Sequence, residues 1–95
     1  MNKYEIMFIV KADLEEKDVK DAAKTYESLL KDVKAKSVSL KDLGSKKFAH
    51  PIKKEVRGYY YLINAECNAN TIAELDRRMR IDERILRHLI VKEEE

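Results

Sequence analysis

The stretch Tyr4-Glu5-Ile6-Met7-Phe8-Ile9-Val10 decides how the rest of the sequence is interpreted. It is rich in β-branched and aromatic residues, which favour strands. Alternation places Met7 and Ile9 on one face of such a strand and three further apolar side chains on the other. A strand that is apolar on both faces belongs in the middle of a sheet and not at its edge. The sequence therefore predicts a central strand over residues 4–10.

Two later segments have the spacing of amphipathic helices. Asp13 with Glu16, and Thr71 with Glu74, resemble capping boxes that would begin these helices. Apolar residues follow each capping pattern at intervals of three and four, as expected for one buried helix face. These stripes consist of Val19, Ala22, Ala23, Tyr26, Leu30 and Val33 in the first helix and of Ile72, Leu75 and Met79 in the second.

The remaining segments predict three more strands. Gly44 marks a bulge or bend in the first of them, and Pro51, which has no backbone N–H to donate, places this strand at a sheet edge. Residues 53–58 are predicted to form a polar turn, so that the strands on either side pair as a hairpin. The predicted strands span residues 37–52, 59–66 and 85–92.

The resulting element order is βαββαβ. Two helices can cover only one face of a four-stranded sheet, and right-handed crossovers then lead to the ferredoxin-like arrangement. We therefore predict an α+β fold, with a four-stranded antiparallel sheet, two helices on one face and the other face bare. Residues 1–92 form this single domain, and residues 93–95 form a frayed acidic tail, Glu93-Glu94-Glu95.

Composition argues against several functional classes. The chain has 95 residues, enough for one domain, and its 20 basic and 18 acidic residues nearly balance. No apolar run is long enough to span a membrane. The sequence has one cysteine, Cys67, two histidines and no glycine-rich phosphate loop. We therefore expect no metal site, no cofactor and no small-molecule substrate. We expect a cytoplasmic protein that is not an enzyme.

The distribution of charge tells more than its total. Residues 44–63 carry five basic residues, Lys46, Lys47, Lys53, Lys54 and Arg57, against Glu55 alone. Residues 77–92 carry six basic residues against two acidic ones. Such clusters can form a phosphate-binding surface, because affinity for a polyanion grows with the number of phosphates neutralised. For the helical arginines, simple ion pairs such as Glu74–Arg78 and Asp76–Arg80 explain the pattern about equally well.

The string Arg57-Gly58-Tyr59-Tyr60-Tyr61-Leu62 partly matches the signature of the RNA recognition motif. In that fold, aromatic residues of the sheet stack on RNA bases. Alternation, however, places Tyr59 and Tyr61 on the same face as Ile63, the face that the helices are expected to cover. A core role is therefore favoured, and a free-standing single-stranded RNA binder of this type remains an alternative.

As a whole, the sequence resembles the bacterial family of small-subunit ribosomal protein six. Phe48 and His50 stand where that family usually has Leu and Tyr, which are mild departures. The resemblance rests on the opening Lys3–Val10, the segment Gly44–Lys53, the turn Gly58-Tyr59-Tyr60 and the ending Leu86–Lys92.

The resemblance implies a ferredoxin-like structural component of the small ribosomal subunit. Members bind the central domain of small-subunit ribosomal RNA together with small-subunit protein eighteen. Transferred by position, the expected RNA-binding residues are Lys3, Lys46, Lys47, Arg87 and His50, and charge alone adds Lys53, Lys54 and Arg57. A partner protein would also explain a bare sheet face bearing Met7, Ile9, Tyr60 and Leu62. A ferredoxin-like module that binds only protein is a further alternative.

Overall fold

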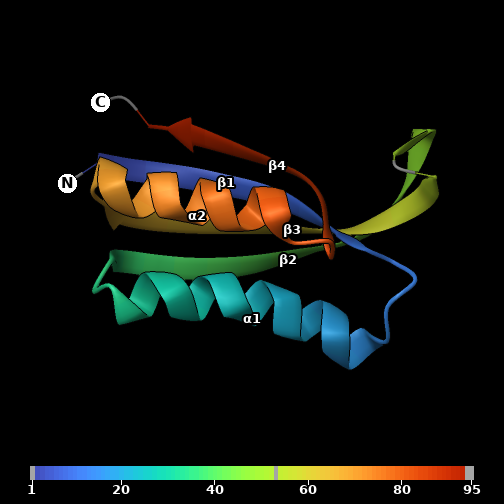
Figure 1. Ribbon diagram of the computed structural model, residues 1–95, viewed down its shortest axis with the longest axis horizontal. Helices are drawn as coiled ribbons and strands as arrows, with labels where there is room; N and C mark the ends of the chain where they lie inside the picture. The colour runs from blue at the N-terminus through green and yellow to red at the C-terminus, as the bar shows by residue number, and fades with distance from the viewer. Residues whose placement is uncertain (1, 53, 94–95) are drawn as a thin grey trace.

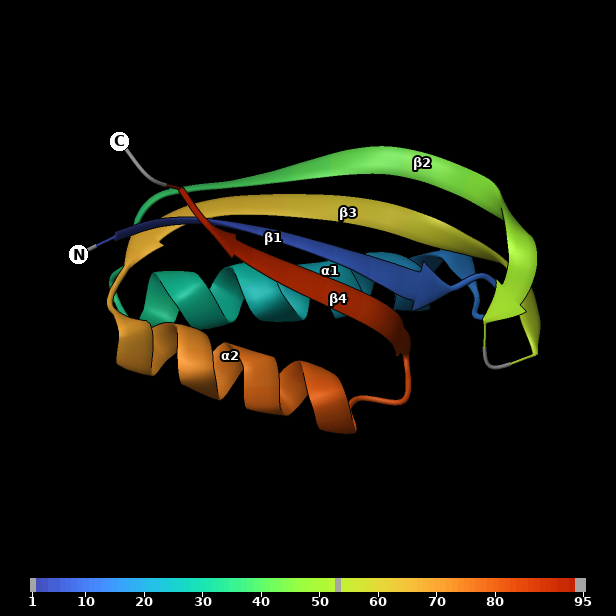
Figure 2. The ribbon, with the colours of Figure 1, turned by 90° about the horizontal axis from the view of Figure 1, so that it is seen from above.

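A four-stranded antiparallel sheet packs with one face against two helices, as Figures 1 and 2 show. This computed structural model describes residues 2–52 and 54–93. The strands lie in the order β2-β3-β1-β4, so the predicted ferredoxin-like βαββαβ fold is confirmed, with β1 and β3 central. The elements are β1 (Asn2–Lys11), α1 (Glu16–Asp32), β2 (Lys36–Ile52), β3 (Glu55–Cys67), α2 (Ala69–Ile81) and β4 (Ile85–Lys92).

The core lies between the sheet and the helices. Phe8 of β1 is fully buried, stacks on Tyr61 at a centroid distance of 5.6 Å and meets the edge of Tyr26 at 5.8 Å. The predicted apolar stripe of α1 is buried as far as Leu30, whereas Val33 forms the C-cap and is exposed. In α2, Leu75 and Met79 are buried and Ile72 packs partly against the core. One face of the central strand thus organises the whole interior.

Both predicted capping boxes are wrong in position. The N-cap of α1 is Glu15, which makes no side-chain cap bond, and the backbone carbonyl of Glu15 accepts from the first turn. In α2 the N-cap is Asn68, whose side-chain oxygen accepts from the backbone N–H of Thr71 at 2.9 Å. Asparagine is among the best N-cap residues, so α2 begins before Thr71 and the Thr71–Glu74 pattern falls inside its first turns.

The β2–β3 hairpin is longer than the sequence predicted. Ile52 pairs with Glu55, so the prediction of a polar turn over residues 53–58 is wrong, because residues 55–58 belong to β3. Lys53 lies outside the described residues. β1 follows β3 only as far as the Lys11–Gly58 pair, so residues 47–52 and 54–57 project beyond the sheet. We call this projection, visible in Figure 1, the hairpin arm.

The predicted features of β2 are confirmed. Gly44 has a φ of 86°, a left-handed conformation that suits glycine, and the pairing register shifts between Asp42 and Gly44. Pro51 lies in an edge strand, as its missing N–H requires. The bulge bends the long strand, so that the arm leaves the plane of the sheet (Figure 2).

A polar link fastens α1 to the connection between α2 and β4. The Tyr26 hydroxyl donates to the Asp82 carboxylate at 2.6 Å, and Arg84 binds the same carboxylate at 2.8 Å. Burial raises the pKa of Asp82, but the hydrogen bonds from Arg84 and Tyr26 outweigh burial and leave this pKa below its ordinary value of 3.8. The ionised form of Asp82 therefore stabilises the folded state.

Replacing Tyr26 by Phe tests this link. We expect the free energy of unfolding at neutral pH to fall by about 1 kcal/mol, because one buried hydrogen bond is removed. A carboxyl whose pKa is lowered by folding stabilises above its unfolded pKa, and this contribution disappears as the pH falls through the folded pKa. Urea unfolding should therefore show that the difference in free energy of unfolding between Tyr26→Phe and the parent becomes smaller below pH 3.8. A gap independent of pH would contradict the role of Asp82.

Tyr61 and its neighbour Tyr60 offer a matched test of which sheet face is the core. Tyr61→Ala should lower the free energy of unfolding by about 3–5 kcal/mol, because it empties the space against Phe8. Tyr60→Ala, on the opposite face of β3, should cost clearly less in the same denaturant titration. If Tyr61→Ala left stability unchanged, Tyr61 would be a surface residue available to stack on bases.

Candidate functional site

The sheet face opposite the helices carries a continuous apolar surface. Met7 of β1 pairs with Leu62 of β3 on one side and with Leu89 of β4 on the other, so their side chains form a row across three strands. Met7 is 38% exposed and Leu89 is 60% exposed. Among the described residues no helix covers this face (Figure 2). We call it the open face, with apolar residues Met7, Ile9, Tyr60, Leu62, Leu89 and Val91.

The open face brings together all four predicted partner-binding residues, Met7, Ile9, Tyr60 and Leu62. Ile9 is the least accessible of them, because it packs beside Gly58 together with Phe48 of the hairpin arm. A Cβ atom at Gly58 would lie only 2.8 Å from Phe48 Cζ, so glycine permits this close approach. Met7, Ile9, Arg87 and Leu89 line a shallow hollow of about 310 Å³ between β1 and β4, together with His88.

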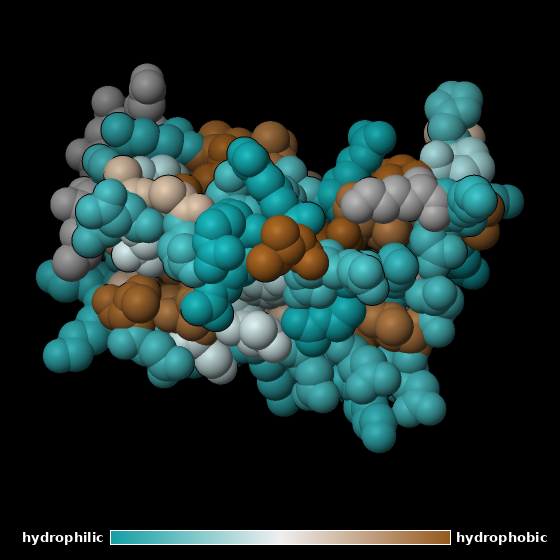
Figure 3. All heavy atoms as spheres, viewed as in Figure 1, coloured by the Kyte–Doolittle hydropathy of each residue, from teal (hydrophilic) through white to brown (hydrophobic). Residues whose placement is uncertain are grey.

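Sequence reasoning missed two apolar residues of the open face, Leu89 and Val91, and the packing of Phe48 beside it. Leu89 and Val91 alternate with inward residues of β4, and this period was the signal that could have placed them. Phe48 could not be placed from the sequence, because its position depends on how the hairpin arm bends over Gly58. By contrast, hydrophilic side chains dominate the side of the molecule seen in Figure 1, where apolar residues form separate patches (Figure 3).

The hairpin arm and its base gather most of the predicted RNA-binding cations. Lys46 pairs with Gly58 and Lys47 with Arg57, while His50 and Lys54 lie further along the arm. The Lys46 ammonium sits 5.1 Å from the centre of the Tyr60 ring, at the border of the open face. Within the described residues, the arm cations and Lys46 make no ion pair with a carboxylate. Their charge is therefore available to an external anion.

The arginines of α2 and its following turn are largely neutralised. Arg77 and Arg78 both bind Glu74, and their hydrogen bonds hold the pKa of Glu74 at about 2. Arg80 binds Asp76 at 2.7 Å and Arg84 binds Asp82 at 2.8 Å. The predicted pairs Glu74–Arg78 and Asp76–Arg80 are thus confirmed, and Arg77 and Arg84 are paired as well.

Arg87 differs from the other arginines of this stretch. It is exposed, lies opposite Ile9 on the open face, and within the described part of the chain makes no ion pair. The next residue, His88, points to the helix side and lies 2.6 Å from the Asp76 carboxylate. Arg87 is therefore a free cation at the border of the apolar surface, as Lys46 is on the other side.

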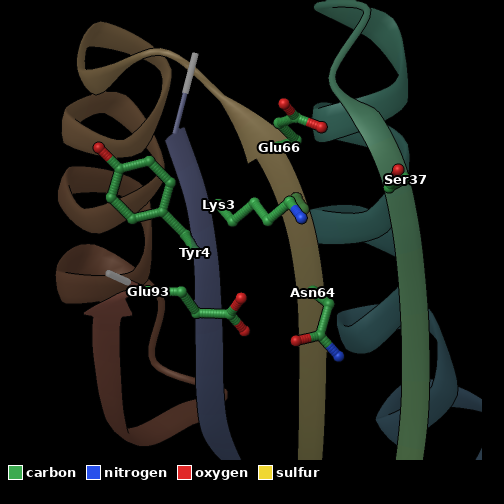
Figure 4. A pocket seen from close by; sticks show the side chains of 7 residues that line it. Lys3, Tyr4, Ser37, Asn64, Glu66 and Glu93 are labelled. Carbon is green, nitrogen blue, oxygen red and sulfur yellow. The ribbon is translucent and has the colours of Figure 1, made fainter. Parts of the chain in front are cut away.

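Lys3 lies apart from the other predicted RNA-binding residues. It pairs with Glu66 on β3, and its backbone carbonyl accepts from the N–H of Glu93 at 2.8 Å. Figure 4 shows Lys3 with Glu66, Asn64 and Glu93 around one small pocket. Lys11, which pairs with Gly58 near Lys46, comes eight positions after Lys3 in β1, a distance of about 26 Å along an extended strand. Glu93 is also tied to β1, so the predicted frayed tail does not include it, and residues 94–95 are outside the described residues.

The structure does not favour base stacking by the tyrosines that matched the RNA recognition motif. Tyr61 is 4% exposed and packs under the helices, and Tyr59 packs partly against the same core. Within the described residues, no three His, Cys, Asp or Glu side chains are placed to hold a metal ion. No described helix combines the length and the apolar character needed to span a membrane.

Comparison with known proteins gives a consistent result. The family model for ribosomal protein S6 matches residues 3–92. Small ribosomal subunit protein bS6 of Trichlorobacter lovleyi is 41% identical over 91 residues, which cover 96% of this chain and 75% of that protein.

Solved structures agree with the family match. The crystal structure of 30S ribosomal protein S6 from Thermotoga maritima superimposes with a TM-score of 0.89 at 26% identity, covering 97% of this chain and 87% of that one. A protein of Arabidopsis thaliana with a TM-score of 0.62 and 11% identity, covering 100% and 95%, shares the fold alone. The fold, the matched residues and the identity agree, and the chain belongs to the ribosomal protein S6 family of the small ribosomal subunit.

Proposed function

We propose that the chain binds small-subunit ribosomal RNA through its hairpin arm while the open face holds a partner protein. One observation carries the proposal: cations without carboxylate partners border an uncovered apolar surface on the same domain. Lys46 stands at one side of this surface and Arg87 at another. Phosphate contacts from these cations would position the protein, since such contacts fix orientation on a nucleic acid.

The hairpin arm is suited to phosphate contacts. Lys46, Lys47, His50 and Arg57 lie on the paired strands β2 and β3, and Lys54 lies in the turn between them, with Glu55 as the nearby acid. Affinity for RNA grows with each phosphate neutralised, so the arm supplies the main electrostatic contribution. Lys3 contributes less to this proposal, because it lies beside Glu66 and Glu93 at the far end of β1. These contact residues are Lys46, Lys47, His50, Lys53, Lys54 and Arg57, with Arg87 from β4.

The finer identities follow from the family resemblance. We assign the RNA as the central domain of small-subunit ribosomal RNA and the partner as small-subunit protein eighteen. The open face supports a protein partner, because monomeric proteins rarely leave a continuous apolar surface uncovered. The role is structural and non-catalytic. The alternative of a protein-only module remains testable, since it predicts no salt-dependent affinity for ribosomal RNA.

Replacing Lys46 and Lys47 by Ala tests the RNA interface. We expect weaker binding to a central-domain RNA fragment, with the slope of log affinity against log salt falling by about one for each phosphate that is no longer neutralised. Filter binding over a salt series measures both quantities. The control removes the same charge from α1 by Lys17→Ala with Lys20→Ala, which should leave the slope unchanged. An unchanged slope for the Lys46 and Lys47 variant would remove both residues from the RNA interface.

Leu62→Glu tests the partner surface. A buried charge on the open face should weaken binding to small-subunit protein eighteen by more than about tenfold, because a central apolar side chain becomes a desolvated carboxylate. Calorimetric titration with the purified partner measures the change. Val33→Glu is the matched control, since Val33 is an exposed apolar residue on the C-cap of α1, away from the sheet. Equal effects of the two variants would argue against the open face.

A further inference from the structure

The two edges of the sheet differ in how well they are protected against pairing with another strand. β2 has three register shifts and carries Pro51 together with exposed lysines, all of which discourage edge-to-edge contact. β4 is regular from Arg87 to Lys92 and exposes Leu89 and Val91, which are 60% and 44% accessible. Within the described residues, β4 pairs only with β1, so its outer edge is free. An exposed, regular and apolar edge is a surface for strand addition.

The backbone direction of β4 follows from one hydrogen bond. The N–H of Glu93 donates to Lys3 of β1, so the backbone groups of Glu93 point inward. Residues two apart on an antiparallel strand point their N–H and C=O groups the same way, so the backbone groups of Val91 and Leu89 also point to β1. The N–H and C=O groups of His88, Ile90 and Lys92 consequently face the outer edge. An added antiparallel strand must pair with these three residues.

This direction restricts how a second copy of β4 could pair with the first. Residues whose backbone groups point to the outer edge must pair with residues of the same kind in the second copy. Two-fold symmetric pairing can therefore be centred on Leu89, Ile90 or Val91, but not on a point between two residues. The register centred on Ile90 places Leu89 opposite Val91 and Arg87 opposite Glu93, all on the open face. Cross-strand pairs of apolar residues and of opposite charges both stabilise a sheet. The register centred on Leu89 would instead set Arg87 against Val91, and the one centred on Val91 would set Leu89 against Glu93.

We propose that two copies of this chain pair through the outer edges of β4, centred on Ile90, to form a continuous eight-stranded sheet. Arg87 and Glu93 of one copy meet Glu93 and Arg87 of the other, which gives the free cation on the open face a partner. On the helix side His88 faces Lys92, and Asp76, bound to His88, supplies the opposing negative charge. An interface of one strand with one strand is smaller than most stable interfaces, so the dimer is weak and depends on concentration.

Charge exchange tests the register. Sedimentation equilibrium over a wide range of concentration should show dimers of the parent chain. Arg87→Glu and Glu93→Arg should each raise the dimer Kd by about tenfold, because two symmetric ion pairs become like-charge pairs. The double variant Arg87→Glu with Glu93→Arg should restore the parent Kd. Lys41→Glu, on the opposite edge strand, is the control and should leave Kd unchanged.

Hydrogen exchange gives a second measurement on the unmodified chain. The backbone N–H groups of His88 and Ile90 should exchange more slowly as concentration rises, whereas those of Leu89 and Val91, already facing β1, should not change. A monomer at every concentration, or a double variant that fails to recover, would overturn the proposal. Arg87 is also a proposed RNA contact residue, so the two proposals are kept apart by their tests: the dimer is measured without RNA, and the RNA test changes Lys46 and Lys47, which lie on β2 and not on β4.

Discussion

The rest of the structure depends on β1, a strand that is apolar on both faces but covered on only one. Its Phe8 face is buried among Tyr26, Tyr61 and the helices, and this packing supplies the core. No helix in the described part of the chain covers its Met7 face, since α1 and α2 both lie on the other side of the sheet. Apolar residues of this second face, such as Met7, are therefore left partly exposed. A small domain that leaves so much apolar area uncovered is built for assembly with other molecules.

Ion pairing decides which cations can act outside the molecule. The chain carries nearly equal numbers of basic and acidic residues, so its total charge does not indicate which surface could bind an anion. On α2 and the turn that follows it, arginines bind nearby carboxylates and lower the pKa of Glu74 and Asp82. On the hairpin arm, acids are scarce, and Lys47 and Lys54 are exposed. Membership in a small-subunit ribosomal family, which assigns the chain to the cytoplasm, is consistent with a surface of this kind.

The hairpin arm joins these two features. Gly58 allows Phe48 to pack closely beside Ile9, and Lys46 lies over Tyr60, so that the base of the arm is part of the open face. The bulge at Gly44 turns the long strand out of the sheet plane. Cationic and apolar side chains thus lie next to one another at the base of the arm.

The sequence by itself determined the element order, the central place of β1, the edge position of β2 and the burial of Tyr61. These follow from local periodicity, from the missing N–H of Pro51 and from the number of helices available to cover a sheet. Only the tertiary structure decided that Asn68 caps α2, that β3 begins at Glu55, and that Lys3 lies far from Lys46. It also separated free Arg87 from the paired arginines. The distance between Lys3 and Lys46 is set by pairing between strands that are remote in sequence. The choice among neighbouring caps, turn positions and ion-pair partners depends on local three-dimensional geometry, which periodicity alone does not specify.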